Sequence, residues 1–446
     1  MPLTYTVTKK YTIPHLTVYF SVFSFVAIIA LAVLNVILQG YDIVTVLRPD
    51  PNITASYWWS TRVGSVRSAG DCDPVSLSKE MMFSTNSSLF SYKLRSMFHA
   101  NKQTMTVATS YMANPLSSCT VDGILANVDL VRSTLKFDVP ILCMGSDIPF
   151  SLSLISSFSI DQKNQYYDDI VAHYIQNKPS REGLELGQGG LLRRNPSDPL
   201  NTIAVIDAIS SDLEFALNFV ASRSTDVIPT SVATGGLLSC PGGQNATCKP
   251  EEMIMTAPRS GTTYSNGSYV TAPGVGPFLA PIERSFLNMF TALQDAFHID
   301  LGNIQPSNTL LSKNAFAARI QPDPALSGFI QGQNGATICS WGIGCVKDTT
   351  WVDQLLASNP DLNVTIPSVL STGNAPAVIA VDYLCPEFRL KRPGSLLTSV
   401  FIGTWSMYMA LLGIFELIGP TLEKRLGRKR KTENTSGPEL GYESKS

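Results

Sequence analysis

Few residues in this chain of 446 are spaced for catalysis or metal binding. Asp169 and His173 lie four apart in a stretch with helical periodicity, so they share one helix face. There an acid could orient a base, or both could bind a metal. No third partner is evident, which favours a surface ion pair. The other histidines are His15, His99 and His298, too few to supply histidine-based chemistry broadly.

Short motifs give no stronger indication of an activity. Asp71-Cys72-Asp73 matches the acidic pair of sugar-nucleotide transferases only superficially, because Cys72 and Pro74 favour a turn beside a disulfide. No Gly-x-Ser-x-Gly, His-Glu-x-x-His, Walker or dinucleotide-binding motif occurs. We therefore expect no cofactor and no metal. The two carboxylates of a glycosidase can lie far apart in sequence, so an ectoenzyme acting on carbohydrate remains an alternative.

The chain has eight cysteines, an even number, and all of them lie between Cys72 and Cys385. That distribution indicates disulfides in an oxidising compartment. Two pairs enclose short, glycine-containing loops that let the chain turn back on itself, so we predict local disulfides there. These pairs are Cys240–Cys248 and Cys339–Cys345, and the remaining cysteines are Cys72, Cys119, Cys143 and Cys385.

The remaining four cysteines allow three connectivities. Residues 124–130 and 135–142 alternate at strand period and predict a hairpin whose paired residue numbers sum to about 263. Cys119 and Cys143 sum to 262, which favours their pairing. A Cys72–Cys385 bond would then close a very long loop, worth on the order of 5 kcal/mol. The competing arrangement pairs Cys72 with Cys119 and Cys143 with Cys385.

The segment between residues 39 and 395 mixes strand and helix patterns. Alternation at 379–385 predicts another strand, while periodicity near 3.6 predicts helices at 165–177, 202–221 and 286–297. We therefore expect an α+β domain with an antiparallel sheet, stapled by disulfides. Stretches rich in Gly, Pro, Ser and Thr predict loops at about 180–200, 223–280 and 321–347. The stretch 223–280 is either a glycosylated excursion or the boundary between two lobes.

Two apolar segments flank this domain. Residues 16–38 and 396–418 are each 23 residues long, enough to span a bilayer at about 1.5 Å per residue. The first exceeds a signal-peptide core and lacks a good cleavage site, so we expect an uncleaved signal anchor. The chain then divides into a cytosolic arm (1–15), a first transmembrane helix (16–38), an extracytoplasmic domain (39–395), a second transmembrane helix (396–418), and a basic, disordered cytosolic tail (419–446).

Charges indicate the orientation of the segments. Basic residues cluster before the first segment and after the second, where Gly419-Pro420 is expected to end the helix, so both termini should be cytosolic. Asn35 and Glu416 are strongly polar, but they lie near segment ends and can reach lipid headgroups. From Tyr41 to Phe388, 30 acidic and 21 basic residues give a net charge of −9, which disfavours nucleic acid as a partner.

Asn-x-Ser/Thr sequons agree with this topology. Five lie between the apolar segments and should be glycosylated, while Asn434 lies in the tail and should not. The five are Asn52, Asn86, Asn245, Asn266 and Asn363.

The ends of the chain resemble a group of uncharacterised fungal two-pass membrane proteins. The resemblance rests on Trp58-Trp59-Ser60 and on the run from Tyr383 to Gly394, Tyr-Leu-Cys-Pro-Glu-Phe-Arg-Leu-Lys-Arg-Pro-Gly. It covers the ends and little of the middle, and it implies no activity. In layout alone the chain is also similar to trimeric ligand-gated channels, scavenger receptors and flippase accessory subunits.

These observations favour a membrane-anchored extracytoplasmic binding or scaffold protein in the plasma membrane or another secretory-pathway membrane. The expected partners are the lipid bilayer and either another membrane protein or a cell-wall glycan. The alternatives are an oligomeric two-pass channel or transporter accessory subunit, and the carbohydrate-active ectoenzyme.

Overall fold

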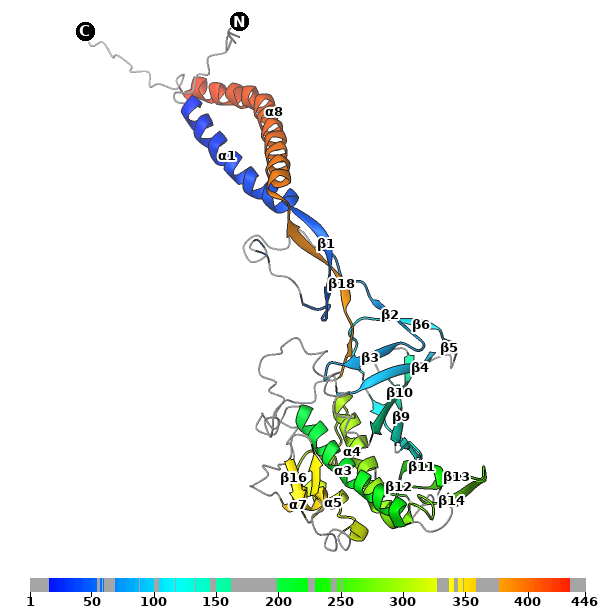
Figure 1. Ribbon diagram of the computed structural model, residues 1–446. Coiled ribbons are helices and arrows are strands. Elements are labelled where there is room, and N and C mark those ends of the chain that lie inside the picture. Colours follow the sequence, from blue (N-terminus) through cyan, green and yellow to red (C-terminus); the bar gives the residue numbers. More distant parts are fainter. Residues whose placement is uncertain are drawn as a thin grey trace, which may run out of the picture. The chain divides into compact units, whose positions relative to one another are not determined.

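The computed structural model contains two apolar helices and a mixed α+β unit with antiparallel sheets, as the sequence predicts (Figure 1). Internal contacts divide the chain into Met1–Asp73 with Tyr383–Ser446, called here the helix unit, and Pro74–Asp382, the sheet unit. The structure describes residues 16–53, 57, 59, 69–87, 89–99, 104–116, 118–132, 134–144, 150–161, 199–223, 229–241, 247–249, 252–326, 337–340, 344–347, 349–357 and 377–433.

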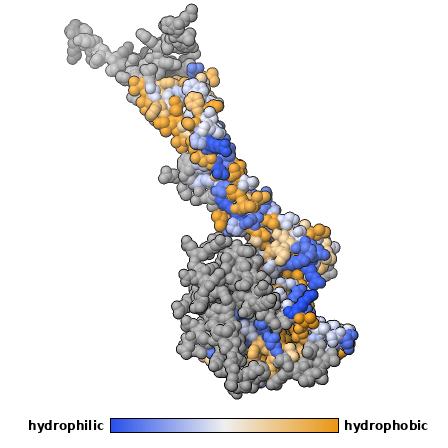
Figure 2. All heavy atoms as spheres, viewed as in Figure 1, coloured by the Kyte–Doolittle hydropathy of each residue, from blue (hydrophilic) through white to orange (hydrophobic). Residues whose placement is uncertain are grey.

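The helix unit contains α1 (Leu16–Gln39) and α8 (Pro393–Glu433). Stretches of 20 residues in α1 and 26 in α8 are long and apolar enough to cross a membrane. Their large apolar side chains point outward, with Phe25 67% and Phe401 69% exposed, and Figure 2 shows hydrophobic residues over the surface of this helix pair. Such continuous apolar surface is unusual for a protein facing water. The two helices therefore indicate association with a membrane.

A small polar contact joins α1 to α8. Asn35 is fully buried, and its Nδ2 donates a hydrogen bond to Thr404 Oγ1 over 3.3 Å. A Cβ added to Gly403 would lie 2.9 Å from both Asn35 Oδ1 and Gln39 Oε1, so the missing side chain permits this close approach. Asn35 therefore faces the other helix and not the headgroups, because an amide buried in an apolar environment needs a hydrogen-bonding partner.

α8 extends beyond the expected end of the second apolar segment. Gly419-Pro420 lies inside the helix, which continues to Glu433, and Figure 1 shows α8 bending toward its C-terminal end. Proline removes one backbone donor and crowds the preceding turn, which can kink a helix without ending it. The helix is therefore longer than the sequence predicts.

A two-stranded ribbon follows α1 and precedes α8. Strands β1 (Tyr41–Arg48) and β18 (Tyr383–Leu390) pair antiparallel over their full length, with Tyr41 opposite Leu390. The disulfide Cys72–Cys385 ties the segment after β1 to β18 across a sequence separation of 313 residues. The two helices are thus held together through paired strands as well as through their own contact.

Aromatic residues pack on this ribbon. The Trp59 ring stacks on Tyr57 with centroids 4.8 Å apart and meets Tyr41 and Phe388 edge-on. The Phe388 N–H donates to Tyr57 Oη over 3.0 Å. Trp59 and Phe388, which lie in the two segments that carry the resemblance at the chain ends, therefore belong to one packed cluster.

The sheet unit is built on a twelve-stranded antiparallel sheet. Its main path runs in the order β14-β13-β11-β8-β9-β10-β4-β3-β17, with β12, β5 and β7 pairing at the side. These strands are β3 (Met82–Thr85), β4 (Ser91–His99), β5 (Met105–Thr106), β7 (Cys119–Thr120), β8 (Gly123–Asp129), β9 (Thr134–Met144), β10 (Phe150–Asp161), β11 (Pro229–Ser239), β12 (Ile254–Thr256), β13 (Arg259–Tyr264), β14 (Tyr269–Pro273) and β17 (Ile379–Ala380). Two shorter sheets pair β2 (Val75–Ser78) with β6 (Ala108–Tyr111) and β15 (Thr337–Ser340) with β16 (Gly344–Lys347).

The predicted hairpin is present with the expected register. Paired residues of β8 and β9 sum to 263, as in Leu125 opposite Asp138, and Cys119 of β7 lies opposite Cys143 of β9. Alternate residues of β9 are buried, as the period-2 pattern predicts.

Three loop and strand predictions are wrong. The 321–347 stretch, expected to be a loop, contains β15 and β16. The 223–280 stretch, expected to be a loop or a lobe boundary, contributes β11 to β14 to the main sheet. The threonines and glycines of this stretch interrupt the apolar alternation that would have predicted strands. In β11, a Cβ on Gly236 would lie 2.6 Å from the Phe290 ring, so this position requires glycine. The single strand expected at 379–385 is two strands, since β17 joins the main sheet and β18 pairs with β1.

Helices cover the main sheet. α3 (Pro199–Arg223) packs against α4 (Glu283–Asp300), which follows the short η2 (Ala280–Ile282), and Figure 1 shows α3 and α4 side by side. The sheet-facing side of α4 is aromatic, with Phe297 stacked on Phe90 at 3.9 Å between centroids. α5 (Lys313–Arg319) and α7 (Trp351–Ala357) complete this layer in the described part of the chain. Both long helices lie where periodicity predicts them.

The contact between α1 and α8 can be tested by cross-linking. In a variant with Asn35→Cys and Thr404→Cys, oxidation in native membranes should link the two new cysteines, because the replaced side chains touch. Adding Gly403→Leu should lower the yield of the linked peptide, since Gln39 Oε1, which this variant keeps, lies 2.9 Å from the added Cβ. Peptide mass spectrometry measures the yield. Gly413→Leu is the matched control, because a Cβ there meets nothing within 4 Å, and an equal loss in both variants would contradict the packing.

Candidate functional site

α4 is buried on nearly every side, including its polar residues. Its buried polar side chains are Ser285, Asn288, Thr291, Gln294, Asp295, His298 and Asp300. Residues of this kind are rare in a helix interior unless they find partners. On α4 several of them bind irregular segments that follow the helix.

Residues 303–323 are held against α4 by these side chains. Asn288 Nδ2 donates to the Gln321 carbonyl over 2.6 Å, and Asp323 Oδ2 accepts from Ser285 N–H and Oγ. Asp295 Oδ2 accepts the Thr309 N–H over 2.7 Å. The segment has no strand partner here, so side chains of α4 satisfy its backbone groups.

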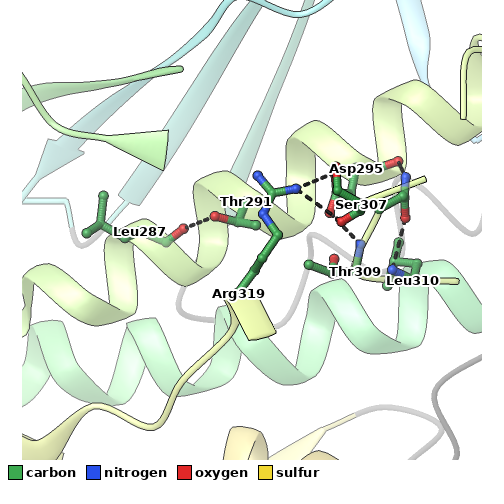
Figure 3. A network of polar contacts seen from close by, with 8 residues as sticks. Leu287, Thr291, Asp295, Ser307, Thr309, Leu310 and Arg319 are labelled. Atoms are coloured by element: carbon green, nitrogen blue, oxygen red, sulfur yellow. Dashed lines mark hydrogen bonds and ion pairs between the residues drawn. The ribbon is translucent and has the colours of Figure 1, made fainter. Parts of the chain in front are cut away.

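Arg319 closes this network. Its Nη1 lies 3.6 Å from Asp295 Oδ1 and donates to the Ser307 carbonyl over 3.3 Å, as Figure 3 shows. Burial raises the pKa of the Asp295 carboxyl, whereas the Arg319 charge and the Thr309 N–H lower it. The effect of burial is the larger, so the pKa of Asp295 is raised overall. Whenever that carboxyl is ionised, the Arg319 guanidinium balances its negative charge.

A cavity of about 180 Å³ lies beside this network. The buried residues that line it are Val121 and, from α4, Gln294, Asp295 and His298. It opens to solvent where Thr120, Asp122 and Gln305 are exposed. The complete lining is Thr120, Val121, Asp122, Leu238, Met253, Gln294, Asp295, His298, Asn303, Gln305, Ser307 and Arg319.

Two disulfides border the walls of the cavity. Cys119–Cys143 precedes the lining residues Thr120 to Asp122, and the Cys119 carbonyl accepts from Asn303 Nδ2 over 2.6 Å. Cys240–Cys248 closes the connection between Leu238 and Met253, the two lining residues on that side. Cross-links at these positions restrict wall movement, as a preformed ligand site requires.

The imidazole of His298 is held neutral. Burial lowers its pKa to about 4, and the nearby Arg319 charge adds to the effect. At neutral pH the ring therefore offers one donor and one acceptor and no charge. A neutral imidazole suits hydrogen bonding to an uncharged ligand.

Gln294 has an unsatisfied polar atom. The residue is 3% exposed, and its Oε1 accepts no hydrogen bond from any described residue. A buried acceptor left without a donor typically costs about 1–3 kcal/mol of stability. Gln294 lines the cavity, but this oxygen is itself enclosed by the protein.

No group of three His, Cys, Asp or Glu residues is placed to hold a metal in the described part of the chain. Asp295 is already engaged by Arg319 and Thr309, so it does not act as an unencumbered base.

The residues singled out from the sequence lie elsewhere. Asp169 and His173, with the predicted 165–177 helix, fall outside the described residues, as do Asn245, Asn363 and Asn434. Asp73 forms a bridge with Leu384 in the helix unit. The sequons Asn52, Asn86 and Asn266 are exposed. Cys339 and Cys345 lie opposite each other in the β15–β16 pair, so the backbone register is compatible with the disulfide predicted there.

Sequence reasoning did not find Gln294 and Asp295, and it noted His298 only as a histidine. The available signal was the polar set at 294, 295 and 298 within the apolar periodicity of 286–297. Their partners Thr309 and Arg319 lie beyond the helix, in a segment without a regular pattern.

No protein family, curated protein or solved structure matches this chain in the comparisons made. The site is therefore interpreted from its own geometry.

His298 should make stability depend on pH. Its pKa is about 6.5 unfolded and about 4 folded, so on acidification the unfolded chain binds the proton first. Stability present above pH 6.5 is lost as the pH falls toward 4, on the order of 3 kcal/mol. Relative to His298→Gln, the wild-type apparent melting temperature should fall by several degrees over this range, measured by scanning fluorimetry. A constant difference would contradict the buried neutral imidazole.

Proposed function

We propose that this chain is a two-pass membrane protein of the secretory pathway whose sheet unit is an extracytoplasmic binding domain. The observation that carries the membrane part is the outward-facing apolar surface of α1 and α8, with Phe25 and Phe401 about two-thirds exposed. In the bilayer these side chains face lipid, and the Asn35–Thr404 contact lies between the helices.

Disulfides support an outer location for the sheet unit. Cys119–Cys143 and Cys240–Cys248 lie inside this unit, and Cys72–Cys385 lies in the helix unit, beside the β1–β18 ribbon that follows α1 and precedes α8. Disulfides persist in the secretory lumen and outside the cell, whereas cytosolic thiols stay reduced. With both apolar helices spanning the membrane, the intervening unit lies on the oxidising side and both termini lie in the cytosol.

The cavity beside α4 supports a binding role. It is concave and open to solvent, and two disulfides border its walls. Binding sites commonly combine a preformed hollow with a few polar groups that fix orientation. The cavity is thus the place where this domain would hold a small ligand.

The topology makes a prediction about glycans. When the full chain is translated into sealed microsomes, Asn266 should be glycosylated, because it is exposed at the turn between β13 and β14. Asn266→Gln should then remove one glycan, seen as a gel shift, whereas Asn434→Gln should change nothing. Added protease should digest a C-terminal tag and leave the sheet unit protected.

Glycan on Asn434, or a protected C-terminal tag, would contradict this topology. Ser268→Ala provides the matched control, because it removes the same sequon while leaving Asn266 in place. The Ser268 hydroxyl donates to Asn266 Oδ1 over 2.7 Å, so its loss changes little beyond the sequon and this turn.

A further inference from the structure

The last part of α8 carries a dense run of positive charge. Of the 14 residues from Pro420 to Glu433, six are Lys or Arg and two are Glu. The basic residues are Lys424, Arg425, Arg428, Lys429, Arg430 and Lys431. This run begins six residues after Ile418, where the apolar stretch of α8 ends. A dense positive charge attracts a polyanion, and the polyanion nearest to the end of a membrane-spanning helix is the headgroup layer of the bilayer.

These charges belong to a helix. α8 continues through Gly419-Pro420 to Glu433, so the basic run is helical and lies in the same element as the apolar stretch. Basic residues near a span help to set its orientation, and for that purpose a disordered tail serves as well as a helix. A helix in addition distributes its residues over fixed faces, because positions three or four apart share a face.

One face of this segment is apolar. Ile418, Leu422 and Leu426 follow one another at four-residue intervals, so they form a stripe along the helix, called here the leucine stripe. The basic residues at positions next to this stripe, called here the flanking set, are Arg425, Lys429 and Arg430.

The other basic residues have a helical spacing of their own. They are spaced i, i+4 and i+7, which places all three on one face, opposite the leucine stripe. This opposite set consists of Lys424, Arg428 and Lys431. An apolar stripe with basic residues beside it is typical of helices that lie in the plane of a membrane surface. The residue pattern therefore suits a segment that lies flat on the membrane.

The bend of α8 decides how many charges reach the headgroups. In a straight, upright helix Lys424 would stand about 9 Å beyond Ile418, and Lys431 about 20 Å. Attraction to the surface is screened over about 8 Å at physiological ionic strength, so most of the run would lie too far out. α8 instead bends toward its C-terminal end, as Figure 1 shows, and Pro420 is the one proline of this helix after Pro393. A bend there allows the basic segment to follow the membrane surface.

We propose that residues 420–433 of α8 form an interfacial helix that binds the anionic lipid headgroups of the leaflet at which α8 leaves the bilayer. The leucine stripe faces the acyl chains, and the flanking set meets the negative headgroups. The inference rests on the membrane-spanning arrangement proposed for α1 and α8, and it adds a lipid class and the segment that recognises it.

The test uses the full chain in lipid nanodiscs made either of phosphatidylcholine alone or of phosphatidylcholine with phosphatidylserine. Hydrogen exchange of the backbone amides of residues 421–433 is measured by peptide mass spectrometry. A helix end in water frays, and binding to the surface stabilises it, so phosphatidylserine should slow this exchange by about tenfold. Raising the salt to about 1 M should reverse the slowing, because screening then acts over about 3 Å.

Two triple variants provide a matched comparison. One changes the flanking set (Arg425→Gln, Lys429→Gln and Arg430→Gln), and the other changes the opposite set (Lys424→Gln, Arg428→Gln and Lys431→Gln). Both remove three charges and insert the same helix-forming residue. The flanking variant should lose most of the slowing caused by phosphatidylserine, whereas the opposite variant should keep at least half of it. An equal loss in both variants would overturn the interfacial helix, since attraction by charge alone does not depend on the face.

The remaining outcomes separate this inference from the proposed function. Equal exchange of the wild-type chain in both kinds of nanodisc would overturn the lipid binding and leave the membrane-spanning arrangement intact. Slowing by added polyglutamate and not by phosphatidylserine would overturn it in favour of an acidic protein partner. A wild-type chain recovered as a water-soluble protein without lipid would overturn both proposals.

Discussion

Buried carboxylates that accept backbone N–H groups hold the helical layer of the sheet unit together. Asp300 accepts the Leu89 N–H and the Tyr92 hydroxyl, and Asp212 accepts the N–H groups of Trp351 and Val352 at the start of α7. Asp295 accepts the N–H of Thr309, which follows it in the chain, and Asp323 accepts the N–H of Ser285, which precedes it. Each bond joins regions that no strand or helix connects, and a buried N–H without an acceptor would be costly.

This arrangement explains why α4 can be buried on both sides. Its aromatic side packs on the sheet by the hydrophobic effect, and its polar side is tolerable only because segments 303–323 and 85–92 bring donors to it. Gln294 is the exception within this polar side, since its enclosed oxygen lacks a donor among the described residues.

Local patterns in the sequence predicted a substantial part of this fold. The β8–β9 register follows from alternation over neighbouring residues, and α3 and α4 follow from their periodicity. The break between β17 and β18 could not be predicted, because the alternation of Ile379, Tyr383 and Cys385 is the same whichever strand each segment joins. The cavity was also out of reach, since Thr120, Gln294 and Arg319 meet only after three distant segments have folded.

Burial gives these groups opposing responses to pH. It raises the pKa of Asp212 to about 7 and of Asp300 to about 6, so the folded chain keeps protons that the unfolded chain releases above about pH 4. Their contribution to stability is therefore present at low pH and is lost as the pH rises toward 7. His298 acts in the opposite direction between pH 6.5 and 4. The two effects offset each other between about pH 4 and pH 6.5.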